Sequence, residues 1–106
     1  MTAVFGTLMR VQGESMRPVF RPGDVLWVCA PRRGWTPAVG DVVAARPAAL
    51  NGRAIIKRVA GIADGQVSLI GEHPDSCDSR RFGAIAVSEL IGPVAARVWP
   101  RRRSSP

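Results

Sequence analysis

The sequence predicts a mostly β protein: a single compact, antiparallel, barrel-like domain with little helix. Its 106 residues fit one domain, and a hydrophobic content of 46% provides one modest core. Glycine and proline are frequent, with 11 and 9 residues, which favours short strands and tight turns over long helices. The apolar residues also occur in short runs bounded by turn residues, as is typical of small β-barrels.

The expected strands follow one another with turn signals between them. Asn51-Gly52 and Asp64-Gly65 are dipeptides typical of tight hairpins. The polar loop "EHPDSCDSRRFG" separates the fifth run from the last, which begins as a short strand or turn. The runs cover residues 1–11, 24–30, 41–46, 54–62, 67–71 and 84–99.

We expect one domain at residues 1–100 and a basic tail at 101–106, "RRRSSP", whose composition predicts disorder. The tail is either solvated, or it binds nucleic acid, acidic lipid or an acidic partner through its positive charge. Aromatic residues make up only 6%, with no tyrosine, so the +7 charge does not indicate a stacking platform for nucleic acid. We expect a monomer that binds no nucleic acid.

No run approaches the roughly 20 apolar residues that a membrane-spanning helix needs. The N-terminus has neither the basic region nor the small-residue cleavage site of a signal peptide. We therefore expect a cytoplasmic bacterial protein without a transmembrane anchor. A peripheral contact with a membrane surface stays open.

Cys29 and Cys77 are the two cysteines, and their spacing does not suggest a secreted disulfide scaffold, so we expect reduced thiols. His73 and Cys77 are four residues apart, but two ligand types without a further partner make a weak metal motif. We expect no metal and no cofactor.

Lys57 lies within the apolar run "AIIKRVAGI". Strand alternation puts Lys57 on one face of this run and Arg58 on the other, so one of the two cations faces apolar neighbours if either face is buried. Burial disfavours the charged ammonium and lowers the pKa of a lysine, which can then act as a general base. An arginine cannot, because it stays protonated.

Ser15 lies in "GESMRPVF", on a bend that Gly13 permits and Pro18 stiffens. A neutral lysine amine beside a serine hydroxyl can accept its proton, and the serine can then attack a carbonyl. Taken alone, the spacing also fits a turn serine and a strand lysine whose ammonium reaches water.

Four ordered stretches resemble the signal peptidase I family of Ser/Lys-dyad proteases. They are "GESMRPVF", then "RPGDVLWV" with "VGDVVAAR", then "IIKRVAGI", and finally "GEHPDSCDSRRFGAIAVSELIGPV". The resemblance implies the mostly antiparallel β catalytic core of this family. It also implies cleavage of extended peptides after small side chains.

The resemblance assigns a role to each matching position. Ser15 matches the nucleophile, and its backbone N–H would contribute to the oxyanion hole. Lys57 matches the general base, and Ser76 the serine that orients the lysine amine. The supporting residues are Asp78 and Arg80 as a structural pair, Gly83 as the glycine that follows, and Met16 as part of the substrate pocket.

The sequence departs from the family pattern at several places, among them a shortened hairpin, "IADGQ", in place of the usual Pro-Gly-Asp. Gly13 stands where some bacterial members carry a serine that donates to the oxyanion. Glu72 and His73 replace the usual Asp-Asn, which puts the local loop geometry in doubt.

Neither a transmembrane anchor nor a large inserted β-domain is visible in 106 residues. The chain therefore resembles the small soluble subgroup of nickel-type superoxide dismutase maturation proteases of high-GC bacteria, which remove a short N-terminal extension from the dismutase precursor. That precursor is the expected substrate and partner.

Several alternatives compete with this interpretation. One is an anchorless signal-peptidase-like protease acting on exported proteins. A second is a self-cleaving regulator like the SOS repressors, which would need a DNA-binding domain and a scissile linker in the same chain. A third, of a different class, is a catalytically inactive peptide-binding relative. His73, the only histidine, lies in the wrong motif for a Ser-His-Asp triad.

Overall fold

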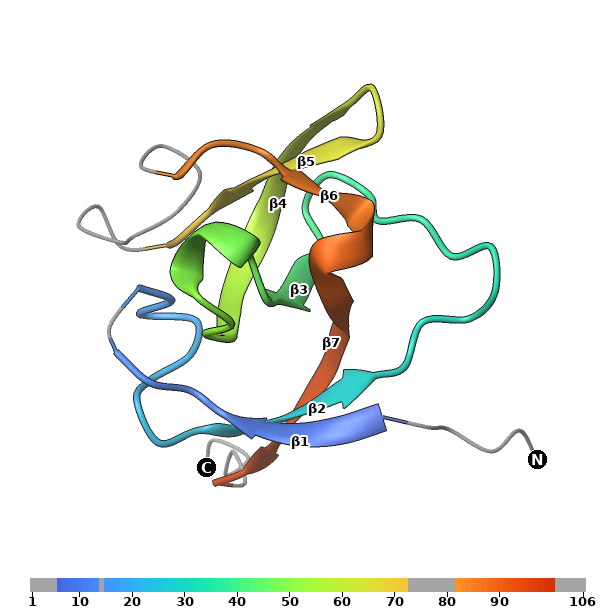
Figure 1. Cartoon of the computed structure of the whole chain (residues 1–106). Helices are drawn as coiled ribbons and strands as arrows, with labels where there is room; N and C mark the ends of the chain where they lie inside the picture. Colours follow the sequence, from blue (N-terminus) through green and yellow to red (C-terminus); the bar gives the residue numbers. More distant parts are fainter. Residues whose placement is uncertain (1–5, 14, 73–81, 101–106) are drawn as a thin grey trace.

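The computed structural model describes residues 6–13, 15–72 and 82–100. The strands form one curled antiparallel sheet in the order β1-β2-β7-β3-β4-β5-β6, a half-barrel with β1 and β6 at its edges (Figure 1). The predicted antiparallel, barrel-like β-domain is thus confirmed. The regular elements within these ranges are β1 Gly6–Arg10, β2 Val25–Cys29, β3 Val42–Ala45, the 3-10 turn η1 Ala48–Leu50, β4 Ile55–Ala63, β5 Gln66–Ile70, β6 Ile85–Ala86, the 3-10 turn η2 Val87–Glu89 and β7 Leu90–Trp99.

Strand β7 joins two half-sheets. Residues 94–99 pair with β2, whereas residues 90–93 pair with β3. We call β1, β2 and residues 94–99 the first half-sheet, and β3 to β6 with residues 90–93 the second half-sheet. Gly92 lies at the junction, where a Cβ would come within 1.9 Å of the Cys29 carbonyl oxygen. Glycine therefore allows β7 to pass close to the end of β2.

Each half-sheet has its own buried cluster. Strands β3 and β4 contribute to both clusters, because successive side chains of a strand point to opposite faces. The first cluster consists of Val11, Met16, Leu26, Val28, Ala44 and Ile56. The second cluster consists of Val43, Ala45, Val59, Val67, Leu69 and Ile85.

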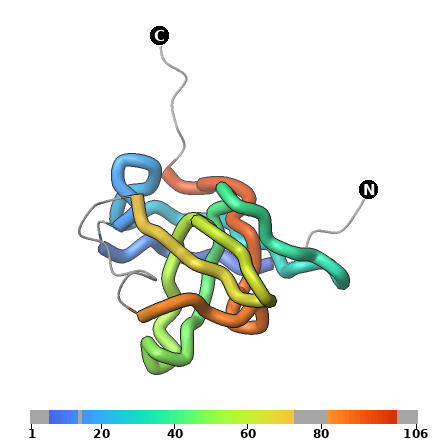
Figure 2. Tube along the Cα trace, turned by 90° about the horizontal axis from the view of Figure 1, so that it is seen from above, coloured from blue at the N-terminus to red at the C-terminus, as the bar shows by residue number. Residues whose placement is uncertain are grey.

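The predicted turns are present, and one connection is longer than expected. Asp64 and Gly65 have φ of 53° and 74°, as a two-residue type I′ hairpin requires. Asn51 also adopts a left-handed conformation, but η1 precedes it, so the link between β3 and β4 is longer than a two-residue hairpin. The connection at residues 30–41 extends away from the sheet (Figures 1 and 2). In the described part of the chain, no helix has the length and apolarity to cross a membrane.

Candidate active site

Ser15 lies in the excursion between β1 and β2, and backbone hydrogen bonds close the base of that excursion. The Val11 N–H donates to the Asp24 carbonyl oxygen at 2.7 Å, and the Gly23 N–H donates to the Val11 carbonyl oxygen at 2.8 Å. Within the loop, the Phe20 N–H donates to the Met16 carbonyl oxygen at 2.8 Å. Ser15 is partly exposed at the start of the turn that this bond closes. The serine is therefore presented on a braced loop, as the sequence predicts.

Two neighbours of Ser15 explain how the loop is held. Gly13 has a φ of 79°, in the left-handed region that glycine adopts without strain, so the predicted bend is confirmed. Met16 is 1% exposed and belongs to the first cluster, which anchors the loop to the core. The predicted contact of Met16 with substrate stays a prediction.

A buried carboxylate fixes the end of the same loop. Asp24 is 4% exposed, and its Oδ2 accepts hydrogen bonds from the Arg21 N–H at 2.9 Å and from Arg97 Nη1 at 3.4 Å. The second bond ties the loop to β7. In the sequence, Asp24 is predicted only as part of the turn "RPGD", and this role is not predicted. The available signal was an aspartate at the end of a tight turn, whose side chain often bonds to nearby backbone.

Lys57 lies on a central strand and is 3% exposed. It stands opposite Val43 of β3 in the antiparallel register, and Val43 is fully buried in the second cluster. The prediction that one of the two adjacent cations faces apolar neighbours is thus confirmed, and that cation is the lysine.

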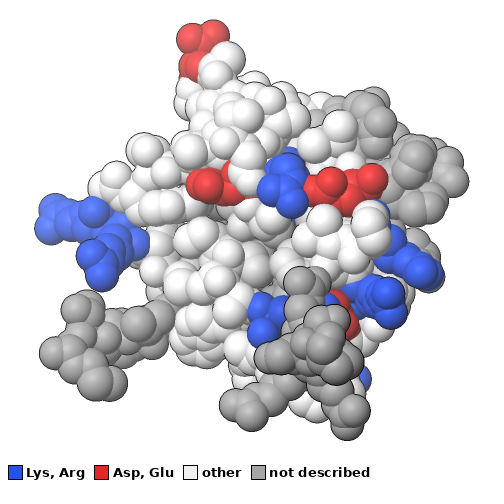
Figure 3. Space-filling view, turned by 180° about the vertical axis from the view of Figure 1, so that it is seen from behind, with Lys and Arg blue, Asp and Glu red and all other residues white. Residues whose placement is uncertain are grey.

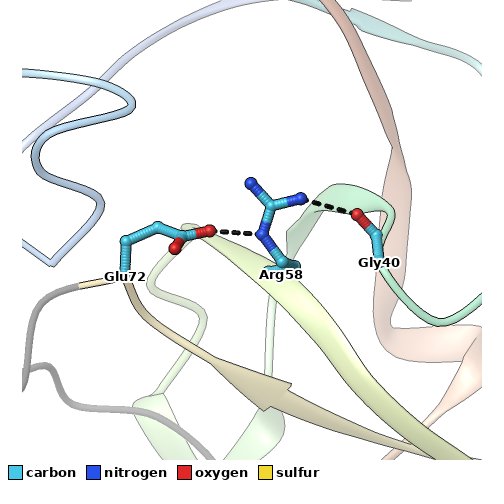
Figure 4. A network of polar contacts seen from close by, with 3 residues as sticks. All are labelled: Gly40, Arg58 and Glu72. Atoms are coloured by element: carbon cyan, nitrogen blue, oxygen red, sulfur yellow. Dashed lines mark hydrogen bonds and ion pairs between the residues drawn. The ribbon is translucent and has the colours of Figure 1, made fainter.

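Arg58, the next residue, has a different environment (Figure 4). Its Nε donates to Glu72 Oε1, and its Nη1 donates to the Gly40 carbonyl oxygen at 2.7 Å. The Arg58 and Glu72 side chains are 34% and 25% exposed, so this ion pair is in contact with water. The sequence-based predictions include Glu72 only as a departure from the family's usual Asp-Asn, and its pairing with Arg58 is not among them. Opposite charges near the ends of two consecutive strands were the available signal.

The serine loop and the lysine strand share one part of the core. Met16, which follows Ser15, and Ile56, which precedes Lys57, both belong to the first cluster. Packing of this cluster therefore couples the two segments that carry the candidate nucleophile and base.

The remaining predicted site residues lie in one stretch of the sequence. Ser76, Asp78 and Arg80 fall outside the described residues. Gly83, which follows them, has a φ of 84°, a conformation that favours glycine.

The metal motif of the sequence also falls in that stretch, since His73 and Cys77 are not among the described residues. Within the described ranges, no group of three or more His, Cys, Asp or Glu side chains is placed to hold a metal ion. Cys29 is a free thiol there.

The family described as Peptidase S24-like matches residues 5–95, which include the serine loop, Lys57 and most of both half-sheets. The chain belongs to the Peptidase S24-like family. It is accordingly a serine-type peptidase of the class that uses a Ser/Lys dyad. No curated protein matches the chain at a significant level.

This family assignment confirms the predicted enzyme class, but it is broader than the predicted family and subgroup. The sequence motifs predict a Ser/Lys peptidase, and that is what the S24-like family comprises. The narrower assignments, to signal peptidase I and to the dismutase maturation subgroup, are not resolved by the match.

Proposed function

We propose that Ser15 and Lys57 form the Ser/Lys dyad of this S24-like peptidase. Ser15 is a partly exposed hydroxyl on a braced loop, and Lys57 is the cation of the pair Lys57–Arg58 that is withdrawn from water. The burial of Lys57 is the single observation that carries the proposal, because burial favours the neutral amine and only the neutral amine accepts a proton.

The reaction would proceed by acyl transfer. The Lys57 amine takes the proton of the Ser15 hydroxyl while Oγ bonds to the scissile carbonyl carbon, whose oxygen becomes an oxyanion. We expect the Ser15 backbone N–H to donate to that oxyanion. The Lys57 ammonium then gives its proton to the leaving amine as the peptide bond breaks, which leaves an acyl ester on Ser15. Water, with Lys57 again as base, hydrolyses the ester and restores the free hydroxyl.

As substrate we propose a precursor protein with a short N-terminal extension, specifically the precursor of a nickel-type superoxide dismutase. The support is the resemblance of the sequence motifs to those of the maturation proteases of that enzyme. Ser76 would orient the Lys57 amine, and Asp78 and Arg80 would support the site. Met16 would contribute to the pocket for small side chains.

The first experiment incubates the purified chain with such a precursor and reads the products by intact mass. Wild type is compared with Ser15→Ala and Lys57→Ala. We expect wild type alone to cleave the precursor, at one site. Cleavage by either variant at the wild-type rate contradicts the dyad.

Two further samples separate the dyad from the substrate. A generic signal-peptide substrate in detergent tests the signal-peptidase alternative, and the chain incubated alone reports self-cleavage. If wild type cleaves the generic substrate but not the precursor, and the variants cleave neither, the dyad stands and the dismutase precursor is wrong.

A pH profile tests the identity of the base. We expect kcat/KM to fall as the pH is lowered, because protonated Lys57 cannot accept the serine proton. His73→Ala serves as the control, since a peptidase that relied on histidine would lose its activity in this variant. Retained activity in His73→Ala, with the same acid limb, is the expected result.

A further inference from the structure

The outward face of the first half-sheet is apolar. In β2, Leu26 and Val28 are fully buried, so the alternate residues Val25 and Trp27 point to the other face. The register places Leu8 and Ala96 on either side of Trp27, and Arg10 and Trp99 on either side of Val25. Paired residues share a face, so these side chains form one surface across three strands. We call it the outer face; it consists of Leu8, Arg10, Val25, Trp27, Ala96 and Trp99.

Large parts of the outer face are open to solvent. Leu8 and Trp99 are each 59% exposed. The Trp27 ring extends across β1, since a Cβ on Gly6 would lie 2.9 Å from Trp27 Cζ2. An exposed leucine and an exposed tryptophan beside the half-buried Trp27 ring form the kind of surface that marks an interaction site.

The excess of positive charge lies in the parts of the sequence that contain the first half-sheet and its loops. Residues 6–40 and 90–100 contain six arginines and two acidic residues, whereas residues 41–89 contain six basic and six acidic residues. The tail adds three arginines directly after Trp99 and Pro100. Seen from behind, acidic side chains lie at the β4–β5 hairpin and on either side of a basic side chain in the middle of the molecule, and further basic side chains lie below and at the edge (Figure 3).

We propose that the outer face docks on an anionic lipid bilayer surface. Tryptophan rings are favoured at the level of the headgroups, leucine enters the acyl boundary, and arginines are attracted to anionic lipids. The outer face combines exposed apolar side chains with Arg10, and three arginines of the tail follow Trp99 and Pro100 in the sequence, so both requirements are met. The docking is independent of the proposed dyad, because no outer-face residue belongs to the serine loop or to β4.

The test measures binding of the full chain to phosphatidylcholine vesicles with and without phosphatidylglycerol, by co-sedimentation. We expect binding to the anionic vesicles, weaker binding at high salt, and little binding to phosphatidylcholine alone. The double variant Leu8→Ser with Trp99→Ser should weaken binding by at least about tenfold, since it removes most of the exposed apolar surface.

The matched control is the double variant Val39→Ser with Ile62→Ser, which changes two exposed apolar side chains away from the outer face. It should bind like wild type. Equal loss in both double variants, or no loss in either, overturns the proposal. If neither double variant loses binding, the arginines alone account for the attraction to the vesicles.

Sedimentation velocity without lipid measures whether the outer face instead binds a second copy of the chain. A wild-type dimer that Leu8→Ser with Trp99→Ser converts to a monomer would assign the outer face to self-association and overturn membrane docking. We expect a monomer in both cases.

Discussion

Each half-sheet packs on a buried cluster of six residues, but the two half-sheets differ in the sign of the charged side chain that each buries. The first half-sheet buries an acid, Asp24, which pairs with the half-buried Arg97, and it carries an apolar outer face. The second half-sheet buries a base, Lys57, and residues 41–89, which contain strands β3 to β6, have six acidic and six basic residues. The difference teaches that the candidate catalytic base and the candidate docking surface are built on separate parts of one sheet, and can be altered separately.

The largest expected effect concerns the two adjacent cations of β4. Lys57→Met should lower kcat/KM by roughly 10²–10⁴-fold, because the general base is lost. The fold should be retained, because an apolar side chain of similar length suits a buried position. Arg58→Met, the matched control, should keep kcat/KM within about tenfold of wild type. Steady-state kinetics with thermal unfolding decides this, and an equal loss in both variants removes the distinction between the cations.

Truncation of one core residue in each half-sheet separates stability from activity. Met16→Ala and Leu69→Ala should each lower the free energy of unfolding by about 2–5 kcal/mol, since both side chains are fully buried. Met16→Ala should also lower kcat/KM of the folded fraction more than Leu69→Ala does, because Met16 anchors the loop that carries Ser15. Denaturant titration and kinetics below the transition test this. A similar loss of kcat/KM in Leu69→Ala would mean that the two clusters are not functionally distinct.

Two strand glycines test the junction of the half-sheets. Gly92→Ala should lower the free energy of unfolding by about 3 kcal/mol, because its Cβ would collide with the Cys29 carbonyl group. Gly61→Ala should change it by less than about 1 kcal/mol, since nothing lies within 4 Å of a Cβ there. Chemical denaturation of both variants measures the difference. If Gly92→Ala were as stable as Gly61→Ala, the close passage of β7 past β2 would be wrong.

The smallest effects concern one ion pair in each half-sheet. Glu72→Gln should lower the free energy of unfolding by at most about 1 kcal/mol, since the Arg58–Glu72 pair is partly solvated. Arg97→Gln should cost more, about 1–3 kcal/mol, because it removes a partner from the buried Asp24. Thermal unfolding at low and high salt distinguishes the two pairs. The Glu72→Gln effect should fade with added salt, and a larger effect for Glu72→Gln than for Arg97→Gln would reverse this ranking.

The strands were predictable because their signals are local. Short β-branched runs, the Asp64-Gly65 turn and the sharp Gly13 bend all depend on neighbouring residues, and each is present in the structure. The candidate dyad residues were also identified from sequence, through motifs rather than spacing, and the family match supports the enzyme class that they indicate. The roles of Ser76, Asp78 and Arg80 stay predictions.

What the sequence alone determined is the all-β architecture, its turns and the peptidase class. The alternation of β4 required that Lys57 and Arg58 face opposite sides, but either side could have been the buried one. Only the tertiary structure decided this, because burial depends on which strands pair with β4 and what lies across the sheet. The same holds for Gly92, for the Asp24–Arg97 contact and for the outer face. Each of these features brings together residues that are distant in the chain, so no local sequence pattern predicts it.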